Sequence, residues 1–436
     1  MKKIFYLPLV LGTLTFTACS DDDDENNDST DFNIVITTPA VDQDSYAANT
    51  TEGNYKSKSF GNTAVDACAT LCDELGKANT AIASAKLNET QEQYLREVLK
   101  TLVSNVIVPT YTALADNVED LEKTLNGLTV QTITQTQINK ACDDFKAARL
   151  YWERSEAFLG GAASDFDIDP TIDSWPLNRT LLLNYFNNGM NDEMLDDASI
   201  LGFHALEFIL FRDGQPRRVA ELQATDTYKN FEKITGEQEL KYAQEICKRL
   251  KERTFQLQVA WDGGKNASRL NVVKTAGLDY TTEAGLSYGD NLVNAGIAGS
   301  KSTFPTLKDA IAQVLSDDEG SCFAIGNEVG TAKIANPFSA GDVSYVESPY
   351  SYNSIADFRD NIRSIRNIWL GSTDKTANKY SFHTFFASVN KQSINQTIEG
   401  AYVKSIEGIS NMPAPFVKYC STIWGIAFED AKIPEE

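Results

Sequence analysis

The chain has 436 residues, with 39 Lys and Arg against 61 Asp and Glu, so its formal net charge is −22. Nucleic-acid binding needs a basic face for phosphate contacts, and this charge argues against such a partner. The length is enough for about two or three domains with cores of their own. Only two histidines are present, which excludes a zinc site with three histidine ligands. The seven cysteines are too few for a disulfide scaffold, and those after residue 19 are expected to be small buried residues.

The first residues are typical of a bacterial export signal. Two lysines precede an apolar run of 15 residues from Ile4 to Ala18. This run is shorter than the roughly 20 residues of a membrane-spanning helix, and it fits the apolar region of a secretory signal. Small residues followed by Cys19 resemble a lipobox. We therefore expect residues 1–18 to be a lipoprotein signal peptide and Cys19 to be the lipid anchor. The alternative is ordinary signal cleavage beside an incidental cysteine.

An acidic segment follows the cysteine. Residues 20–25 are Ser-Asp-Asp-Asp-Asp-Glu, and such a run of like charges repels itself and buries no apolar surface. We expect residues 19–55 to form a flexible tether. The run is also similar to the surface-export signal of some bacterial lipoproteins, although a plain spacer would have the same composition. The predicted location is the outer membrane, with attachment through lipid and exposure at the cell surface as a further expectation.

The apolar spacing from about residue 60 onward is helical, and strand patterns are few. Glycine pairs or Asn-Gly end several of the apolar runs, and a weak strand pattern covers residues 32–37. The predicted fold class is all-α, with two domains that resemble four-helix bundles and pack together, at 56–270 and 271–436. The predicted helices cover residues 71–82, 94–106 up to an interruption at Pro109, 110–125, 138–159, 195–211, 237–261, 306–315, 355–370, 382–398 and 417–431.

One candidate metal site lies within the predicted helix 195–211. His204 and Glu207 are three residues apart, so their side chains project from one face of a helix. An imidazole and a carboxylate together suit iron or zinc, and iron-binding carboxylate bundles use this spacing. Gly202 would allow another helix or a ligand to approach closely. The alternative is a buried histidine whose hydrogen bond is satisfied by the neighbouring glutamate, without a metal.

A second group of candidates lies near the end of the predicted helix 138–159. Trp152 and Glu156 share a helix face, and Glu156 stands among apolar residues. A carboxylate on an apolar face needs a positive partner. That partner is a metal ion, or else Arg149 or Arg154 in a salt bridge. Glu347, in a loop before the helix 355–370, is a further candidate ligand or a plain surface charge.

Three better-known patterns are absent or isolated. The alternating aspartates at 165–173 suggest calcium, but an EF-hand loop needs Gly where Pro170 stands and Glu where Pro176 stands. The zinc-protease pattern His-Glu-x-x-His is absent around His204. Gly-Leu-Ser-Tyr-Gly at 285–289 matches the hydrolase nucleophile pattern, but no buried strand precedes it. These patterns therefore assign no catalytic residue.

Taken in order along the chain, these pieces resemble the imelysin family. The resemblance covers about residues 60–430. The motif Gly-x-His-x-x-Glu alone is a weak indication of the family. It becomes specific because the other motifs occur with it in the same order along the chain. The resemblance rests on the lipoprotein signal, Trp-Glu-Arg-Ser-Glu-Ala-Phe at 152–158, Ile-Asp-Ser-Trp-Pro-Leu at 172–177, Gly-Phe-His-Ala-Leu-Glu at 202–207 and Glu-Ser-Pro-Tyr-Ser at 347–351, with Asp357, Asn361 and Leu370-Gly371.

The resemblance implies a helical protein whose shared residues gather between two bundles. Carried over to this chain, it makes His204 and Glu207 metal ligands, with Glu156 and Glu347 completing the site. Trp175 and Pro176 would shape the loop over that site, beside Gly202 and Trp152.

The resemblance leaves three functions open. Members of the family are lipoproteins or periplasmic proteins, some are iron-regulated, and relatives take part in ferrous iron transport. The first function is therefore an iron-binding lipoprotein linked to uptake through a transport partner, with iron favoured over zinc or calcium. The family is also classed with metallopeptidases, so the second is a peptidase at the same site, although no second histidine or general base stands at recognisable spacing. The third is a metal-free module that binds a peptide or small ligand.

Overall fold

The computed structural model describes residues 59–339, 343–412 and 414–423 of the chain. The predicted signal peptide (1–18), the lipid anchor Cys19, the tether (19–55) and the weak strand pattern at 32–37 lie outside the described residues. Those assignments stay predictions.

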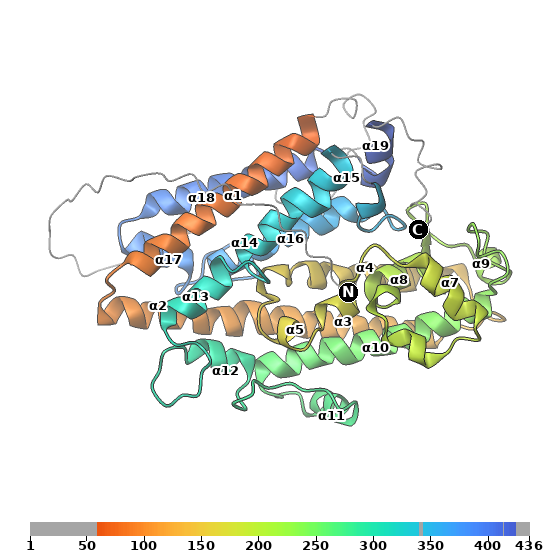
Figure 1. The fold of residues 1–436 in the computed structure, drawn as a ribbon, viewed down its shortest axis with the longest axis horizontal. Helices are drawn as coiled ribbons and strands as arrows, with labels where there is room; N and C mark the ends of the chain where they lie inside the picture. Colours follow the sequence, from red (N-terminus) through yellow and green to blue (C-terminus); the bar gives the residue numbers. More distant parts are fainter. Residues whose placement is uncertain (1–58, 340–342, 413, 424–436) are drawn as a thin grey trace. The chain divides into compact units, whose positions relative to one another are not determined.

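The described residues are almost entirely helical, which confirms the all-α fold class (Figure 1). The only extended pairing longer than a single bridge in this part of the chain is a hairpin of β1 (Phe211–Arg212) and β2 (Gln215–Pro216). The α-helices are α1 (Ser59–Ser84), α2 (Glu89–Leu102), α3 (Val108–Asn126), α4 (Gln135–Glu153), α5 (Ala162–Asp165), α6 (Asp169–Asp173), α7 (Arg179–Asn187), α8 (Gly202–Leu210), α9 (Val219–Leu222), α10 (Gly236–Asp262), α11 (Ala267–Thr275), α12 (Tyr288–Val293), α13 (Leu307–Leu315), α14 (Cys322–Glu328), α15 (Asn336–Ser339), α16 (Ser354–Leu370), α17 (Phe382–Ser388), α18 (Gln392–Ser410) and α19 (Phe416–Ile423). Short 3₁₀ turns are η2 (Glu156–Phe158), η3 (Asp192–Asp196), η4 (Ala198–Ile200) and η6 (Val343–Tyr345), and π-helical turns are η1 (Val103–Ile107) and η5 (Val329–Ala335).

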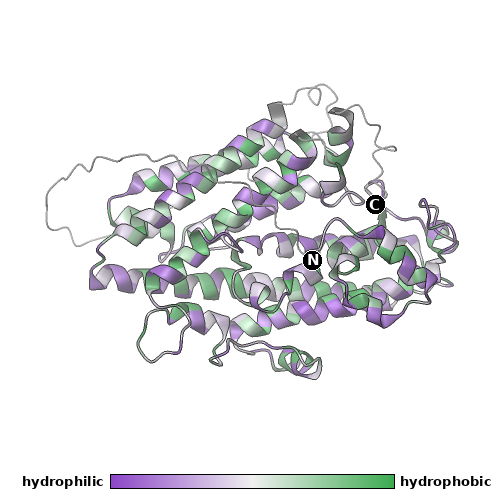
Figure 2. Ribbon diagram, viewed as in Figure 1, coloured by the Kyte–Doolittle hydropathy of each residue, from purple (hydrophilic) through white to green (hydrophobic). Residues whose placement is uncertain are grey.

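One group of helices is built around α3, which packs against both α4 and α10 (Figure 1). The shorter α8 packs on α4 and α10 and closes this group. Hydrophilic and hydrophobic residues are interleaved along most helices (Figure 2), because each helix buries one face. Leu114, Phe145, Leu206 and Ile246, one from each helix, are almost completely buried in this core.

A second group contains α1, α14, α16 and α18. Figure 1 shows α1 and α18 side by side, although they come from opposite ends of the described chain. Gly408 of α18 makes their close approach possible, because a Cβ there would lie 2.9 Å from Cα of Ala64. The division into bundles at 56–270 and 271–436 stays a prediction, and α1 lies with the C-terminal helices in space.

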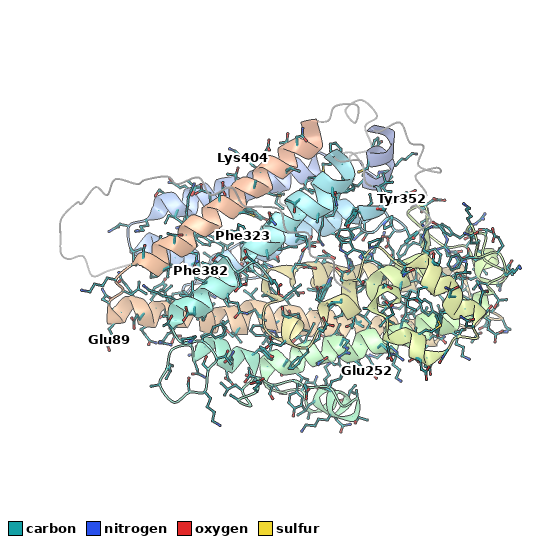
Figure 3. All side chains as sticks on the ribbon, viewed as in Figure 1. Glu89, Glu252, Phe323, Tyr352, Phe382 and Lys404 are labelled. Carbon is teal, nitrogen blue, oxygen red and sulfur yellow. The ribbon has the colours of Figure 1, made fainter. Side chains whose placement is uncertain are left out.

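The two groups meet where α16 packs on α4 and where α14 and α16 pack on η2. Side chains fill the space between the helices (Figure 3). The segments that carry the predicted site residues converge at this junction.

Most predicted helices are confirmed, but the expected interruption at Pro109 is wrong. The helix continues from Glu89 to Asn126 as α2, the π-helical turn η1 and α3. Pro109 stands just after the π-helical turn η1, and this wider turn accommodates a residue that has no N–H to donate within a continuous helix. This helix is long and apolar enough to cross a membrane by composition, yet more than half of its apolar window is buried within the protein. We therefore interpret it as a core helix.

Three other predicted helices are shorter than expected or divided. The helix at 195–211 begins only at Gly202, whose φ of 73° does not fit a helix interior. The helix at 382–398 is divided into α17 and α18 because Asn390 has a φ of 58°. The helix at 138–159 ends at Glu153, and η2 follows. Residues 424–431 of the last predicted helix lie outside the described residues.

The contact between α1 and α18 predicts opposite effects for two glycines of one helix. Gly408→Ala should lower the free energy of unfolding by about 1–3 kcal/mol, because the new Cβ meets the backbone of α1. Gly400→Ala should raise it by up to about 1 kcal/mol, because a Cβ there meets nothing within 4 Å and alanine favours the helix. Denaturant unfolding of both variants measures the difference. Equal effects would contradict this packing.

Candidate functional site

Arg149 of α4 is the centre of a buried charge cluster at the junction of the two helix groups. The side chain is fully buried. Its Nη2 lies 2.6 Å from Oε1 of Glu153, one turn on in the same helix, and 2.5 Å from Oε1 of Glu347. Its Nη1 pairs with Oδ1 of Asp173 at the end of α6, and Oδ2 of Asp357 on α16 lies 3.8 Å from its Nε. One guanidinium therefore joins carboxylates from four segments.

His204 of α8 faces the same cluster. Its Nε2 lies 3.1 Å from Oδ1 of Asp173 and 3.9 Å from Oε1 of Glu347. Its Nδ1 lies 3.3 Å from Oε2 of Glu207, which shares its helix face at the predicted spacing. The imidazole is 3% exposed. One ring nitrogen thus faces the carboxylates of other segments, and the other is held by its own helix.

Glu207 holds a loop in place. Its Oε1 accepts hydrogen bonds from the backbone N–H of Tyr350 (3.0 Å), the N–H of Ser351 (2.7 Å) and the Ser351 hydroxyl (2.6 Å). This loop also carries Glu347. Glu207 therefore positions both His204 and the segment that delivers Glu347.

Gly202 explains why α6 and α8 can meet here. A Cβ at this position would lie 2.0 Å from the carbonyl oxygen of Ile172, and its φ of 73° is one that L side chains rarely adopt. Asp173 directly follows Ile172, so this close approach sets Asp173 beside His204. The predicted role of Gly202 as a residue that shapes the site fits this geometry.

The second helix group completes the cluster. Lys333 of η5 places its Nζ 3.0 Å from Oε2 of Glu347. Asn361 of α16 donates to Oε2 of Glu153 at 2.5 Å. Asp357 accepts from the hydroxyl of Ser348 at 2.5 Å. Asn361 thus binds a carboxylate of the other helix group, while Lys333 and Ser348 bind carboxylates that lie near them in the sequence.

The electrostatics of the cluster depend on burial and pairing. Burial and the Arg149 charge lower the pKa of His204, but the hydrogen bond and charge of Asp173 and the bond to Glu207 outweigh them and raise the pKa to about 9. Burial raises the pKa of Asp173, but the charges of Arg149 and His204 outweigh it and hold this pKa well below its usual range. In this arrangement His204 is a cation and Asp173 an anion at neutral pH.

Other carboxyl groups of the cluster are shifted the opposite way. Burial raises the pKa of Glu153 well above the usual range, although the charges of Arg149 and Lys333 lower it. Burial raises the pKa of Glu156 in the same way, although the charge of Lys333 lowers it. Burial likewise raises the pKa of Asp357 to about 7, although Arg149 lowers it. The cluster has more carboxyl groups than its permanent cations can balance.

Two sets of donor atoms are close enough to hold a metal ion. One atom each from Asp173, His204 and Glu347 lies within 4.8 Å of the other two, and the same holds for Glu153, Glu156 and Asp173. A mixed imidazole and carboxylate set suits iron or zinc. The excess of buried carboxylates is a second feature that fits a cation.

The structure divides the predicted ligands between these sets. His204 and Glu347 belong to the first, and Glu156 belongs to the second. Glu207 adjoins His204 and belongs to neither. Trp152 donates from Nε1 to Oδ2 of Asp173 at 2.7 Å, so it touches the site.

Two residues predicted to shape the loop lie beside the cluster. Trp175 stacks edge-on against Tyr345 with ring centroids 5.6 Å apart, and Pro176 is exposed. Both follow Asp173 closely along the chain, and Tyr345 stands just before Glu347.

Sequence reasoning missed Asp173 and Glu153 as site residues. In the sequence, Asp173 belongs to the calcium-like pattern and to the motif at 172–177, and neither makes it an iron ligand. Asp165 of the calcium-like pattern accepts the Tyr288 hydroxyl at 2.6 Å. The Arg149–Glu153 pair has i,i+4 spacing, which is a visible signal for a helix pair. Ser287 of the hydrolase-like pattern caps α12 by accepting from the N–H of Asp290, which is a structural role.

Comparison with known proteins decides the family. The family model for imelysin, a peptidase family designated M75, matches residues 107–428. The chain belongs to the imelysin family. The resemblance seen in the sequence motifs is therefore confirmed.

Two relatives of the chain have a name connected with iron. The iron-regulated protein A of Synechococcus elongatus is 25% identical over 297 residues, which cover 68% of this chain and 70% of that protein. A crystal structure of an iron-regulated protein A precursor from Parabacteroides distasonis is similar with a TM-score of 0.61 and 25% identity, over 80% of this chain and 94% of that one. A crystal structure of an imelysin-like protein from Psychrobacter arcticum has a TM-score of 0.44 and 12% identity, over 79% and 98% of the two chains.

The raised pKa of His204 predicts a pH-dependent contribution to the stability of this imelysin. A pKa raised from 6.5 to about 9 in the folded protein corresponds to about 3 kcal/mol. This stabilisation is fully present below about pH 6.5 and is lost as the pH rises through about 9. In the presence of chelator, the gap in unfolding free energy between wild type and His204→Gln should therefore narrow between pH 6.5 and 9.5. Denaturant unfolding across that range measures it, and a constant gap would contradict the ion pair with Asp173.

Proposed function

We propose that this imelysin is a cell-envelope lipoprotein that binds iron at His204, Asp173 and Glu347 and serves iron uptake. The observation that carries the proposal is the convergence of one imidazole and two carboxylates within 4.8 Å, buried between the helix groups. The names of the relatives from Synechococcus elongatus and Parabacteroides distasonis support iron as the metal.

The charge balance of the cluster supports a cation. Buried carboxyl groups outnumber the buried cations Arg149 and Lys333. Burial favours the neutral form of several of them, because an uncompensated buried charge is costly, and a bound cation would compensate their charges. A bound metal ion would compete with Arg149 for Asp173 and Glu347, and it requires the neutral form of His204. Iron binding should therefore release a proton at neutral pH.

Metal titration tests the site directly. The wild-type protein, freed of metal, should bind Fe²⁺ under anaerobic conditions, and His204→Ala should lower the affinity by at least about 100-fold, because the only nitrogen ligand is lost. Isothermal titration calorimetry together with elemental analysis of the protein measures both affinity and stoichiometry.

The chain offers a matched control for this variant. His383 is its only other histidine; it is also buried and lies 2.9 Å from Glu399, away from the cluster. His383→Ala should leave iron binding unchanged. Equal affinity in wild type and His204→Ala would overturn the proposed site.

The lipoprotein part of the proposal rests on the first residues of the sequence. Cys19→Ser should abolish labelling with a radioactive fatty acid and move the protein from the membrane fraction to the soluble fraction, because the acyl chains supply the anchor. Cys68→Ser is the control, since Cys68 is buried in the helical core and should not affect labelling. Continued labelling of Cys19→Ser would contradict the anchor.

A metal-free binding module is the alternative that one observation favours. The hydrogen bond between His204 and Glu207 and the ion pairs of Arg149 already form a connected network without any ion. The same titration separates the two functions, because a module of this kind would bind no Fe²⁺ at saturation. A peptidase reaction at the site stays a hypothesis, and chelator-sensitive peptide cleavage that is lost in His204→Ala would support it.

A further inference from the structure

A cavity lies between α10, α12 and α13 and the segment that follows η2, apart from the charge cluster. Its volume is about 170 Å³, which at about 30 Å³ per molecule is room for about six waters or one small ligand. Both α5 and α12 pack on α10 beside it (Figure 1). Arg149 and the carboxylates that contact it are not among the residues that line the cavity. The proposed iron ligands therefore have no part in it.

Aromatic rings form much of the cavity wall, which includes Phe158, Trp261, Tyr288 and Phe304. The rings of Trp261 and Tyr288 have centroids 6.1 Å apart and are inclined by 46°. The faces of aromatic rings carry negative potential, so they attract cations, and tryptophan does so most strongly. A wall of this composition favours a positively charged ligand that also has apolar groups.

The charge of the wall favours a cation as well. Of the described residues that line the cavity, Asp165 is the only charged one. Tyr288 donates its hydroxyl to Oδ2 of Asp165 at 2.6 Å, which fixes the carboxylate at the cavity and leaves Oδ1 for a ligand. Asp165 is exposed, so the cavity opens to solvent beside a carboxylate. An anionic ligand would meet this carboxylate without a lysine or arginine in the wall to balance it.

One buried donor of the wall is unsatisfied. Trp261 is 5% exposed, and its Nε1–H has no hydrogen-bond partner among the described residues. Asn291, in contrast, donates to Oγ1 of Thr303 and accepts from the N–H of Thr303, both at 2.8 Å. A buried N–H without an acceptor is costly. A ligand with an oxygen atom would supply the missing acceptor.

Two adjacent glycines leave this space open. A Cβ at Gly161 would lie 2.9 Å from Cδ1 of Tyr288 and 3.7 Å from Cζ2 of Trp261, so a side chain there would cover the aromatic pair. A Cβ at Gly160 would lie 2.8 Å from Nε2 of Gln313, which also lines the cavity. The missing side chains thus keep the two rings accessible to a ligand.

We propose that this cavity binds a small methylated ammonium compound that carries an oxygen acceptor. The ammonium group lies against the rings of Trp261 and Tyr288 and beside Oδ1 of Asp165, and the oxygen of the ligand accepts from Nε1 of Trp261. Aromatic walls are a general means of holding such cations, because the methyl groups pack on the rings while the charge is attracted to their faces. This binding site is independent of the proposed iron site.

Choline is the probe for this proposal, because it combines a trimethylammonium group with one hydroxyl. Isothermal titration of the wild-type protein, freed of metal, should show one choline bound per chain. The neutral analogue of choline, in which carbon replaces the charged nitrogen, has the same shape. It should bind at least about 10-fold more weakly, because it lacks the attraction to the rings and to the carboxylate. Equal affinity for the two compounds, or no binding of choline, would overturn the proposal.

A charge-removing variant tests the position of the ligand. Asp165→Asn should lower the affinity for choline by about 5- to 10-fold and leave that for the neutral analogue unchanged, because only the charge is removed. Asp165 is exposed, so this variant should fold, as thermal melting would verify. Asp143→Asn is the matched control, because Asp143 of α4 is also exposed and does not line the cavity. Wild-type affinity for choline in Asp165→Asn would overturn the proposed site.

The iron-site variant separates this proposal from the proposed function. His204→Ala should bind choline with the wild-type affinity, because His204 does not line the cavity. Choline binding by a wild type that binds no Fe²⁺ would support the cavity site and overturn the iron site, and the reverse result would overturn the cavity site alone. Loss of choline binding in a folded His204→Ala protein would contradict the independence of the two sites and overturn the proposal.

Discussion

The packing of carboxylates around the buried guanidinium of Arg149 is the constraint on which this structure depends. Arg149 contacts Glu153, Asp173, Glu347 and Asp357, which come from four segments of the chain. Leaving a buried charge without its partner costs about 3–5 kcal/mol. The helices that carry these residues must therefore keep their positions relative to one another. The same cluster has more carboxyl groups than permanent cations, and this makes it a candidate for cation binding.

The cluster also joins the two groups of helices. Glu153 of α4 is held by Asn361 of α16, and Glu347 is held by Arg149 from one group and Lys333 from the other. The site consequently exists only where the groups pack together. A cation bound there would add bonds across the junction, so binding and the stability of the junction are expected to be linked.

Each of the three defined residues of the Gly-x-His-x-x-Glu motif has its own structural role. Gly202 allows the backbone near Ile172 to approach, which places Asp173 beside His204. Nε2 of His204 faces the carboxylates, and its Nδ1 contacts Glu207. Glu207 also accepts hydrogen bonds from the loop that carries Glu347. This geometry explains why each residue of the motif stands at its position. Glu207 is a positioning residue for the two proposed ligands His204 and Glu347.

The sequence by itself determined the all-α class, the family and the helices at 110–125, 237–261 and 355–370, because a repeating apolar face is a local property that survives in any helical packing. It also determined that His204 and Glu207 share a face, since that follows from helix geometry alone. Only the tertiary structure decided where helices break, because the positive φ of Gly202 and Asn390 depends on neighbouring segments. It likewise decided that Asp173 and Glu153 join the site and that Glu156 lies close to both, because burial and pairing are set by residues far apart in the chain.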